Sequence, residues 1–516
     1  MYNAAADLLD HHIPAGRGDR LAFIDDDGRY TYGELIARVD ACANALHLLG
    51  LRPGDRIVLG LLDSIAFPTA FLGAIKAGIV PIPVNTLFRA ADYAYILTDS
   101  AAVAAIVSRA LLPAYEEAAR SCGWSGRLIV ANGVDATAAS FDDLLAAAPG
   151  ESPTARTSPG SECFWLYSSG STGRSKGTVH RHESLAQTAR LFGREVLGLH
   201  ESDVVYSAAK LFFAYGLGNA LTFPLAIGAT SVLVAQRPTP SVVIETLARE
   251  AATIFCGVPT LFSSLLDSPA FAARPKLSLR LCTSAGESLP KGVGEAWRAA
   301  TGVDIVDGIG STEMLHIFVS TRPGDVTYGV TGLPVPGYRV RLVDEHAVDV
   351  APGELGEMLV AGPSAFSHYW NLPEKTSETI VGAWVRTGDK FVQNAAGAFV
   401  HCGRVDDMIK SAGIWVSPSE VESALLSHEA VLEAAVIGAP DSNELIKPKA
   451  YVVLRSGYVP GDELAADLQA FVKSRLAPYK YPRWIEFIGE LPKTPTGKIK
   501  RHVLRAAQPD ARVARA

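Results

Sequence analysis

Residues 163–177, CFWLYSSGSTGRSKG, join an apolar run to a loop of small hydroxylated residues, three glycines and one lysine. The apolar run Cys163–Tyr167 has the composition of a buried strand. Glycines let the loop backbone adopt open conformations and approach a ligand closely. The N–H groups and hydroxyls of such a loop are suited to wrap phosphate oxygens, and Lys176 adds a positive charge. The stretch predicts a strand followed by a phosphate-binding loop, with a flexible polar turn as the alternative.

Two better-known nucleotide motifs are absent. The nucleoside-triphosphatase loop GxxxxGK[ST] needs Ser or Thr after its lysine, and Gly177 follows Lys176 here. A dinucleotide motif GxGxxG beginning at Gly216 would need glycine where the chain has Leu221. Neither of those folds is favoured.

Outward from the loop, short apolar runs alternate with longer helical stretches. The runs that we interpret as strands are Arg56–Leu61, Ile79–Val84, Val103–Val107, Arg127–Val130, Ser231–Val234, Ile254–Cys256, Leu279–Cys282 and Asp304–Val306. Residues 64–77 between the first two are interpreted as a helix. Strand, helix and strand in succession predict βαβ units and parallel sheets covered by helices.

The pattern changes twice towards the C-terminus. Beyond about Val326, short strands and turns dominate: Tyr338–Val343, Gly356–Val360, Trp384–Thr387 and Ala398–Cys402. From Arg404 a compact α+β pattern follows, with helices at 418–427 and 461–476 and strands at 431–437, 449–454 and 483–487. We therefore predict an α/β fold with a large N-terminal domain, residues 1–405, that includes a β-rich subdomain at about 326–405. A small C-terminal domain spans residues 406–516.

Composition sets limits on the class of protein. Of 516 residues, 48% are apolar and 20% charged, which is typical of a soluble globular chain. The net charge, 47 − 54 = −7, does not favour a nucleic-acid binder. Six scattered cysteines without a CxxC motif favour neither disulfides nor zinc and predict a cytoplasmic location. The N-terminus lacks the basic region of a signal peptide.

Two segments have more than one interpretation. Residues 211–236 carry no charge, yet their glycines and proline predict a helix and a buried strand rather than a membrane span. Residues 471–516 hold 11 Lys and Arg against 3 Asp and Glu. This basic excess fits either a patch for an anionic ligand or a solvated tail.

Several segments, in order, resemble the adenylate-forming (AMP-binding) superfamily of acyl-CoA synthetases, peptide synthetase adenylation domains and luciferases. They are the phosphate loop Tyr167–Gly177, the adenine-side segment Ser284–Glu287, the nucleotide and magnesium segment Asp307–Glu313, the ribose turn Arg386–Asp389, the hinge Gly403–Lys410 with Pro418–Glu422 after it, and the catalytic-lysine loop Pro492–Lys498. The resemblance implies an enzyme that joins a carboxylate to AMP from ATP and then passes the acyl group to a thiol.

The resemblance also assigns residues to the nucleotide. It implies that Lys498 bridges the substrate carboxylate and the α-phosphate, and that Glu313 with Thr172 holds Mg²⁺. The implied ATP and AMP contacts are Ser168, Ser169, Gly170, Ser171, Thr172, Gly173, Lys176, Gly286, Glu287, Asp307, Gly308, Ile309, Gly310, Ser311, Thr312, Asp389, Arg404 and Lys498. Without the resemblance, Glu313 could be an ordinary surface acid and Lys498 a solvated loop lysine.

The same resemblance makes Asp406 the pivot about which the C-terminal domain turns between the two half-reactions. Ser411 and Gly413 would then lie beside the path of coenzyme A. Gly413 could also be an ordinary turn glycine. Lys498 resembles the reversibly acetylated lysine of acyl-CoA synthetases, which implies a lysine acetyltransferase and deacetylase as partners.

The segments 210–219 and 310–318 resemble those of benzoate–CoA ligases within this superfamily. Phe213, where many relatives have histidine, is shared with that group. The resemblance implies an acyl pocket formed by Phe213, Ala214, Tyr215, Ala285, Gly310, His316, Ile317 and Lys410. Tyr215 and Ile317 would supply flat apolar walls and His316 a donor to the carboxylate, although His316 could instead be a core histidine.

The prediction is therefore a benzoate–CoA ligase that uses ATP, Mg²⁺ and coenzyme A. Two enzymatic alternatives remain: a ligase for 4-hydroxybenzoate, 2-aminobenzoate or cyclohexanecarboxylate, and an adenylation enzyme that loads a carrier protein. A non-enzymatic nucleotide-binding protein is less favoured because Lys498 and Glu313 are both present. No nucleic acid or membrane partner is predicted, and the sequence leaves the oligomeric state open, a homodimer included.

Overall fold

The computed structural model describes residues 1–168, 175–273, 275–411, 414–441, 445–477, 480–493 and 499–507. Side chains are not described at positions 406, 410, 411, 414 and 415. Some predicted site residues lie outside the described residues: Ser169, Gly170, Ser171, Thr172, Gly173, Gly413 and Lys498. For Asp406, Lys410 and Ser411, only the backbone is described.

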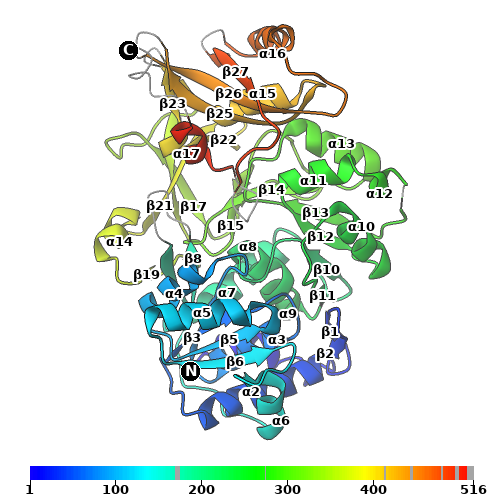
Figure 1. Ribbon diagram of the computed structural model, residues 1–516, viewed down its shortest axis with the longest axis vertical. Coiled ribbons are helices and arrows are strands. Elements are labelled where there is room, and N and C mark those ends of the chain that lie inside the picture. Colours follow the sequence, from blue (N-terminus) through cyan, green and yellow to red (C-terminus); the bar gives the residue numbers. More distant parts are fainter. Residues whose placement is uncertain are drawn as a thin grey trace.

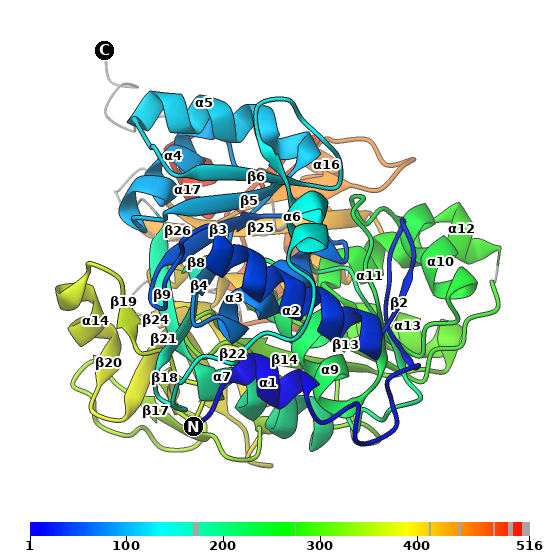
Figure 2. The ribbon, with the colours of Figure 1, turned by 90° about the horizontal axis from the view of Figure 1, so that it is seen from below.

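A parallel sheet of five strands, in the order β4-β3-β5-β6-β7, lies in the N-terminal part of the chain. Its strands are β3 (Arg56–Gly60), β4 (Val80–Pro83), β5 (Ala104–Ser108), β6 (Arg127–Ala131) and β7 (Ala139–Ser140). Figure 2 shows α4 (Ala90–Asp99) and α5 (Leu112–Cys122) on one face and α2 (Tyr32–Leu48) and α3 (Ala66–Lys76) on the other. Helices on both faces explain why these strands read as uninterrupted apolar runs.

A nine-stranded sheet, in the order β16-β15-β14-β13-β12-β10-β11-β1-β2, forms the second layer. Its strands are β1 (Leu21–Ile24), β2 (Arg29–Thr31), β10 (Val204–Ser207), β11 (Thr230–Val232), β12 (Ile254–Gly257), β13 (Leu281–Ser284), β14 (Ile305–Gly310), β15 (Ile317–Ser320) and β16 (Leu333–Pro334). The strands from β1 to β14 are parallel, and the pairs at the two edges are antiparallel. Apolar side chains of α10 (Pro240–Arg249), α11 (Pro259–Leu266) and α13 (Lys291–Thr301) pack against it, with α12 (Pro269–Ala272) beside them.

The two sheets share one core. Every residue of α3 is buried, and the cluster that contains it includes Leu217, Leu221 and Leu225 from the uncharged segment 211–236. That segment forms α8 (Ala214–Leu217), a π-helical turn (Gly218–Thr222), α9 (Phe223–Ile227) and β11. The predicted helix and buried strand are confirmed. Among the described residues, no helix combines the length and apolarity needed to span a bilayer.

The predicted phosphate loop is framed by a small antiparallel sheet, β19-β9-β8. The predicted strand before the loop is β8 (Glu162–Ser168), and β9 (Lys176–Arg181) returns from the loop beside it. The third strand, β19 (His368–Tyr369), comes from much further along the chain. This sheet brings residues 366–370 next to β9, which the sequence pattern did not indicate.

The β-rich region forms an antiparallel five-stranded sheet. Its strands are β17 (Arg339–Val343), β18 (Leu355–Ala361), β20 (Ile380–Val381), β21 (Trp384–Gln393) and β22 (Phe399–Arg404), with α14 (Pro373–Thr379) beside them. The strand β21 is much longer than the predicted Trp384–Thr387. It continues because Gly388, with φ +71°, accommodates an irregularity and pairing then resumes along β18 and β22.

The C-terminal unit lies at the top of Figure 1, at the opposite end from the N-terminus. It contains β23 (Ile409–Ser411), β24 (Ile414–Val416), α15 (Pro418–Leu426), β25 (Val431–Pro440), β26 (Ile446–Leu454), α16 (Asp462–Arg475), β27 (Trp484–Phe487) and α17 (Arg501–Ala506). A short 3₁₀ turn, Val405–Asp407, joins it to β22. The predicted boundary at 405–406 falls in this turn, and the division into a fixed and a mobile domain stays a prediction.

Candidate active site

The carboxyl ends of the neighbouring parallel strands β13 and β14 bring two predicted nucleotide segments together. Ser284 at the end of β13 pairs in register with Asp307 in β14. The other predicted residues at these strand ends are Ala285, Gly286, Glu287, Gly308, Ile309 and Gly310. Open α/β sheets bind ligands at this edge. The structure therefore places the adenine-side and nucleotide segments side by side where a ligand site is expected.

Backbone geometry is unusual at this edge. Gly286 has φ +94°, a backbone conformation that residues other than glycine rarely adopt. At Gly310 a Cβ would lie 2.6 Å from the His316 carbonyl oxygen, so the chain closes here only around a glycine. Leu315 has φ +64°, which is rare for a leucine. Such conformations cluster at functional sites, and this one lies between Glu313 and His316.

Asp307 is a buried carboxyl group within this edge. Its backbone N–H donates to Thr321 Oγ1 over 3.0 Å. Burial raises the pKa of its carboxyl to about 8, because the charged form is desolvated.

Glu313 and Lys176 meet through a tyrosine. Tyr369 Oη donates a hydrogen bond of 2.6 Å to Glu313 Oε1. Lys176 Nζ lies over the Tyr369 ring, 4.2 Å from its centroid. Burial lowers the pKa of Lys176, and Glu313 opposes this shift. A carboxylate predicted to hold Mg²⁺ and an ammonium group predicted to bind phosphates are thus held by the same aromatic side chain.

The predicted ribose turn is a network of polar side chains. Arg404 Nη1 donates over 3.0 Å both to Asp389 Oδ2 and to the Thr387 carbonyl oxygen. His401 Nε2 lies 3.4 Å from Asp389 Oδ1, and its Nδ1 lies 2.8 Å from Ser288 Oγ. Ser288 follows the adenine-side segment directly. The structure therefore brings together the predicted Asp389 and Arg404 and adds His401 as a link to the β13 edge.

The predicted acyl residues lie in two apolar clusters. Tyr215, Ala285 and Ile317 pack in the same cluster, whereas Phe213 and Ala214 pack against the α3 cluster. His316 is 3% exposed and is surrounded by the rings of Tyr215, Phe192 and Phe223 at centroid distances of 5.5, 5.2 and 4.6 Å. The structure therefore gathers Tyr215, His316, Ala285 and Ile317 and places Phe213 and Ala214 at the boundary with the neighbouring core.

One ring nitrogen of His316 has no hydrogen-bond partner among the described residues. His316 Nε2 lies 3.4 Å from the Tyr215 carbonyl oxygen, while Nδ1 is buried without a hydrogen-bond partner in the described part of the chain. Burial lowers the pKa of His316 to about 3, so its ring is neutral at neutral pH. The Tyr215 hydroxyl is hydrogen-bonded to Thr283 Oγ1. Whether His316 donates to a substrate carboxylate stays a prediction.

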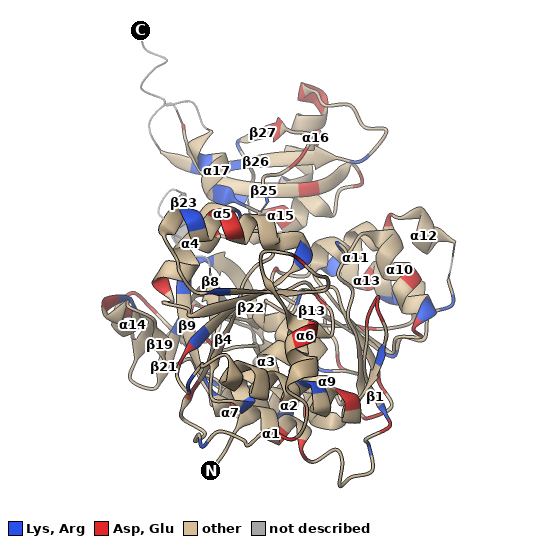
Figure 3. Cartoon of the chain, turned by 60° about the horizontal axis from the view of Figure 1, so that its bottom comes forward, with Lys and Arg blue, Asp and Glu red and all other residues tan. Residues whose placement is uncertain are grey.

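The turn that contains Asp406 is tied to the end of the chain. Asp407 forms ion pairs with Arg505 and with Arg501, the latter at 3.7 Å. Arg501 also donates two hydrogen bonds of 2.8 Å to the Glu422 carboxylate. Figure 3 marks basic positions on α17 in blue, and the ion pairs pair them with carboxylates of the same unit. Part of the basic excess of residues 471–516 is thus matched by carboxylates, which weakens both the anion-patch and the solvated-tail interpretations of it.

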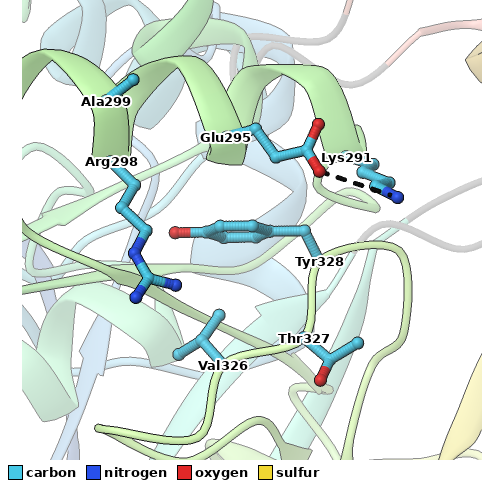
Figure 4. Close-up of a pocket in the computed structure, with 7 residues that line it drawn as sticks. All are labelled: Lys291, Glu295, Arg298, Ala299, Val326, Thr327 and Tyr328. Carbon is cyan, nitrogen blue, oxygen red and sulfur yellow. Dashed lines mark ion pairs between the residues drawn. The ribbon is translucent and has the colours of Figure 1, made fainter.

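Two cavities lie away from the predicted nucleotide and acyl residues. One, of about 590 Å³, is lined by Lys291, Glu295, Arg298, Ala299, Val326, Thr327 and Tyr328 (Figure 4). The other, of about 570 Å³, is lined by Ala91, Asp92, Ala94, Tyr95, Ile96, Thr98, Ser121, Cys122 and Ser175. Neither is lined by a predicted nucleotide or acyl residue. Arg298 and Glu295 flank the Tyr328 ring in the first, so its walls are mixed in charge and match no chemistry expected of the site.

Sequence reasoning missed Tyr369 and His401. Tyr369 belongs to the run His368-Tyr369-Trp370 before Pro373, which has no charge or glycine pattern that would single it out. His401 lies two residues before Gly403 in a segment interpreted only as a strand. Both can be recognised only from the sheet pairing, which places β19 beside β9 and β22 beside the ribose turn in β21.

Comparison with known proteins identifies the class. The family described as "AMP-binding enzyme" matches residues 10–370, and "AMP-binding enzyme C-terminal domain" matches residues 420–498. The chain belongs to the AMP-binding enzyme family. The resemblance inferred from the sequence motifs is confirmed.

The chain is 56% identical to the benzoate–CoA ligase of Thauera aromatica, covering 98% of this chain and 96% of that protein. It is 47% identical to a 4-hydroxybenzoate–CoA/benzoate–CoA ligase of Rhodopseudomonas palustris, covering 98% and 94%. A crystal structure of a benzoate CoA ligase from Burkholderia xenovorans LB400 superposes with a TM-score of 0.92 at 49% identity, covering 98% of this chain and 100% of that one. The predicted fold, a large helix-covered N-terminal part with parallel sheets and a small C-terminal unit, is confirmed.

Proposed function

We propose that the protein is a benzoate–CoA ligase that converts ATP, benzoate and coenzyme A into AMP, diphosphate and benzoyl-CoA. The observation that carries the proposal is the 56% identity to a benzoate–CoA ligase across nearly the whole chain. The cluster of Tyr215, His316 and Ile317 at the carboxyl edge of the nine-stranded sheet agrees with a flat aromatic substrate.

The first half-reaction forms benzoyl-adenylate. A benzoate oxygen attacks the α-phosphorus of ATP, and the bond to the diphosphate leaving group breaks. Two anions must approach each other, so positive charge stabilises the transition state. We assign this charge to Lys498, which would bridge the carboxylate and the α-phosphate, and to Lys176, which would lie near the leaving phosphates. The N–H groups and hydroxyls of residues 168–173 would hold the phosphate oxygens.

A divalent cation fits the Glu313 site. Glu313 is a hard oxygen donor whose Oε1 already accepts the Tyr369 hydrogen bond. Mg²⁺ is commonly held by one or two carboxylates together with substrate phosphates, so a single fixed carboxylate suits it. Glu313 and Thr172 would hold the ion, and Mg²⁺ would supply positive charge against the phosphates.

We assign the ribose and adenine contacts to the ribose turn and to the carboxyl ends of β13 and β14. Asp389, fixed by Arg404 and His401, would accept the ribose hydroxyls. Glycine backbone at the ends of β13 and β14 allows the adenine and phosphate groups to approach closely.

In the second half-reaction the thiol of coenzyme A attacks the benzoyl carbon, loses its proton, and AMP leaves with the oxygen that came from benzoate. We infer that the unit after residue 405 turns about Asp406 between the two steps. This would remove Lys498 and bring Ser411 and Gly413 beside the thiol path, with Lys410 near the acyl group only in the closed form. Acetylation of Lys498 would remove the charge that the first step needs.

Substituting Asp406 by proline tests the pivot. Proline fixes φ and restricts the preceding residue, so rotation at this turn is hindered. We expect near-normal benzoyl-adenylate formation and little benzoyl-CoA. Quenched-flow measurement of both products in one reaction gives the answer. Ala395→Pro is the control, because Ala395 is exposed and is the second residue of the turn closed by the bond from the Gly397 N–H to the Asn394 carbonyl oxygen, where proline is favoured. Wild-type benzoyl-CoA formation by the Asp406 variant would show that the pivot lies elsewhere.

Substituting Gly218 by alanine tests the acyl pocket. A Cβ there would lie 2.4 Å from His316 Cδ2 and 2.9 Å from Phe223 Cζ, while the backbone itself is ordinary right-handed helix. The His316 ring must therefore move. We expect the KM for benzoate to rise about tenfold, as for a displaced pocket group worth roughly 1.4 kcal/mol, with the KM for ATP nearly unchanged.

The matched control for that variant is Gly292→Ala. Gly292 lies in the first turn of α13, and a Cβ there meets nothing within 4 Å. It should bind benzoate as the wild type does. Equal KM values for benzoate in the two variants would show that His316 does not line the benzoate pocket.

The proposed function is tested by incubating the protein with ATP, Mg²⁺, benzoate and coenzyme A, and omitting each in turn. Release of AMP rather than ADP, dependent on both benzoate and coenzyme A, supports the ligase. Acid-dependent diphosphate exchange without a benzoyl-CoA product would favour the carrier-loading alternative. Faster reaction with 4-hydroxybenzoate, 2-aminobenzoate or cyclohexanecarboxylate would select one of the substituted alternatives.

A further inference from the structure

Tyr369 lies between two groups of opposite charge that come from distant parts of the chain. Glu313 follows β14, and Lys176 begins β9. Tyr369 contacts the first through its hydroxyl, at 2.6 Å, and the second through its ring face, at 4.2 Å. It is 3% exposed. No ion pair within 4.0 Å joins these two described residues, although burial lowers the pKa of Lys176 and the charge of Glu313 opposes that shift.

The position of Tyr369 is fixed on several sides. Its neighbour Trp370 donates its backbone N–H to the Gly177 carbonyl oxygen over 2.8 Å, beside Lys176. The Tyr369 N–H donates to Thr376 Oγ1 over 3.0 Å. On the other side, the Phe366 N–H donates to the Glu313 carbonyl oxygen over 2.7 Å. The backbone around Tyr369 is therefore tied to the elements that carry both charged residues.

We propose that Tyr369 is a positioning residue for the adenylation half-reaction: it keeps Lys176 and Glu313 apart as two independent charges, one for the phosphates and one for the divalent cation. The inference rests on the proposed function. Without the ring, the two side chains could collapse into an ion pair, and neither charge would then be available to ATP or to the metal.

Each contact suits this role. A cation over an aromatic face is held by a neutral ring, so no carboxylate offsets its positive charge. A hydroxyl that donates to a carboxylate oxygen fixes the carboxylate while leaving its negative charge in place. Mg²⁺ demands near-ideal octahedral geometry, so it benefits from a carboxylate whose orientation is already set.

The test compares Tyr369→Phe, which loses only the hydroxyl, with Tyr369→Leu, which loses the ring face as well. Tyr338→Phe is the matched control. Tyr338 is also a buried tyrosine, and it loses a 2.6 Å hydrogen bond to Ser364 that involves no charged residue. Three quantities are measured: binding of a non-hydrolysable ATP analogue as a function of Mn²⁺ concentration without acid, the melting temperature, and benzoyl-CoA formation from supplied benzoyl-adenylate.

We expect the Mn²⁺ concentration for half-maximal analogue binding to rise about tenfold in Tyr369→Phe and about a hundredfold in Tyr369→Leu, as for loss of a hydrogen bond to a charged group. The reaction of supplied benzoyl-adenylate should stay within about twofold of wild type in both. Tyr338→Phe should lower the melting temperature without moving the Mn²⁺ requirement.

Unchanged Mn²⁺ dependence in both Tyr369 variants would overturn the proposal. So would a parallel loss in all three measurements, because Tyr369 would then support only the fold. If the wild-type protein forms no benzoyl-CoA, the proposed function fails, whereas the acid-free Mn²⁺ titration still decides the role of Tyr369.

Discussion

Replacing Lys498 by alanine is expected to slow benzoyl-adenylate formation by roughly two to three orders of magnitude, as for removal of one preorganised group that stabilises developing charge. Benzoyl-CoA formation from supplied benzoyl-adenylate should fall far less, because the proposed rotation takes Lys498 away before the thiol attacks. The two rates are measured separately, as benzoate-dependent exchange of labelled diphosphate into ATP and as thioester formation.

Lys500→Ala is the control for that variant, since it removes a lysine charge two residues further along the chain. It should leave both half-reactions close to wild type. Equal losses in the two half-reactions of Lys498→Ala would contradict the assigned role of this lysine.

Benzoate is expected to exceed acetate in kcat/KM by about three orders of magnitude, because acetate forfeits some five buried ring carbons at about 0.8 kcal/mol each. Octanoate should also be poor, since an alkyl chain would outgrow a short, flat-walled pocket between Tyr215 and Ile317. The measurement is kcat/KM for benzoate, acetate, octanoate and cyclohexanecarboxylate at fixed ATP and coenzyme A. A preference for octanoate would overturn the aryl assignment and leave the adenylation chemistry untouched.

The same kcat/KM measurement can compare benzoate with 4-hydroxybenzoate, which carries a para-hydroxyl group. The Tyr215 hydroxyl and Thr283 Oγ1 form a hydrogen bond with each other, and we expect them to keep it when a substrate binds. An unpaired buried hydroxyl costs roughly 1–3 kcal/mol, so 4-hydroxybenzoate should be about ten- to a hundredfold poorer than benzoate. Preference for 4-hydroxybenzoate would mean that another polar group reaches the far end of the pocket.

Local sequence pattern predicted much of the fold. The apolar runs that became β3, β5, β6 and β12 differ from the observed strands by one residue at most at each end, because their interior positions are apolar and buried. The strand β13 is Leu281–Ser284 rather than Leu279–Cys282, since pairing of Leu281 with Ile254 sets its register. A short run cannot reveal which neighbour fixes its ends.

The candidate site, like the fold, could be predicted only in part from the sequence. Segments with glycine and charged residues at fixed spacing, such as Asp307–Glu313, indicate their chemistry through the sequence alone. Tyr369 and His401 could not be predicted, because each acts through a partner brought near by sheet pairing and not by sequence spacing. Tyr215 and Phe213 pack against different apolar clusters, and the sequence does not indicate which cluster each ring joins.

The most direct test of the account follows one oxygen atom. Benzoate labelled with ¹⁸O in its carboxylate is converted with ATP and coenzyme A, and the AMP and diphosphate are examined by mass spectrometry. Attack of the carboxylate on the α-phosphorus predicts one ¹⁸O in AMP and none in diphosphate for every benzoyl-CoA formed. Benzoyl-CoA formed with unlabelled AMP would contradict a benzoyl-adenylate intermediate and with it the proposed mechanism.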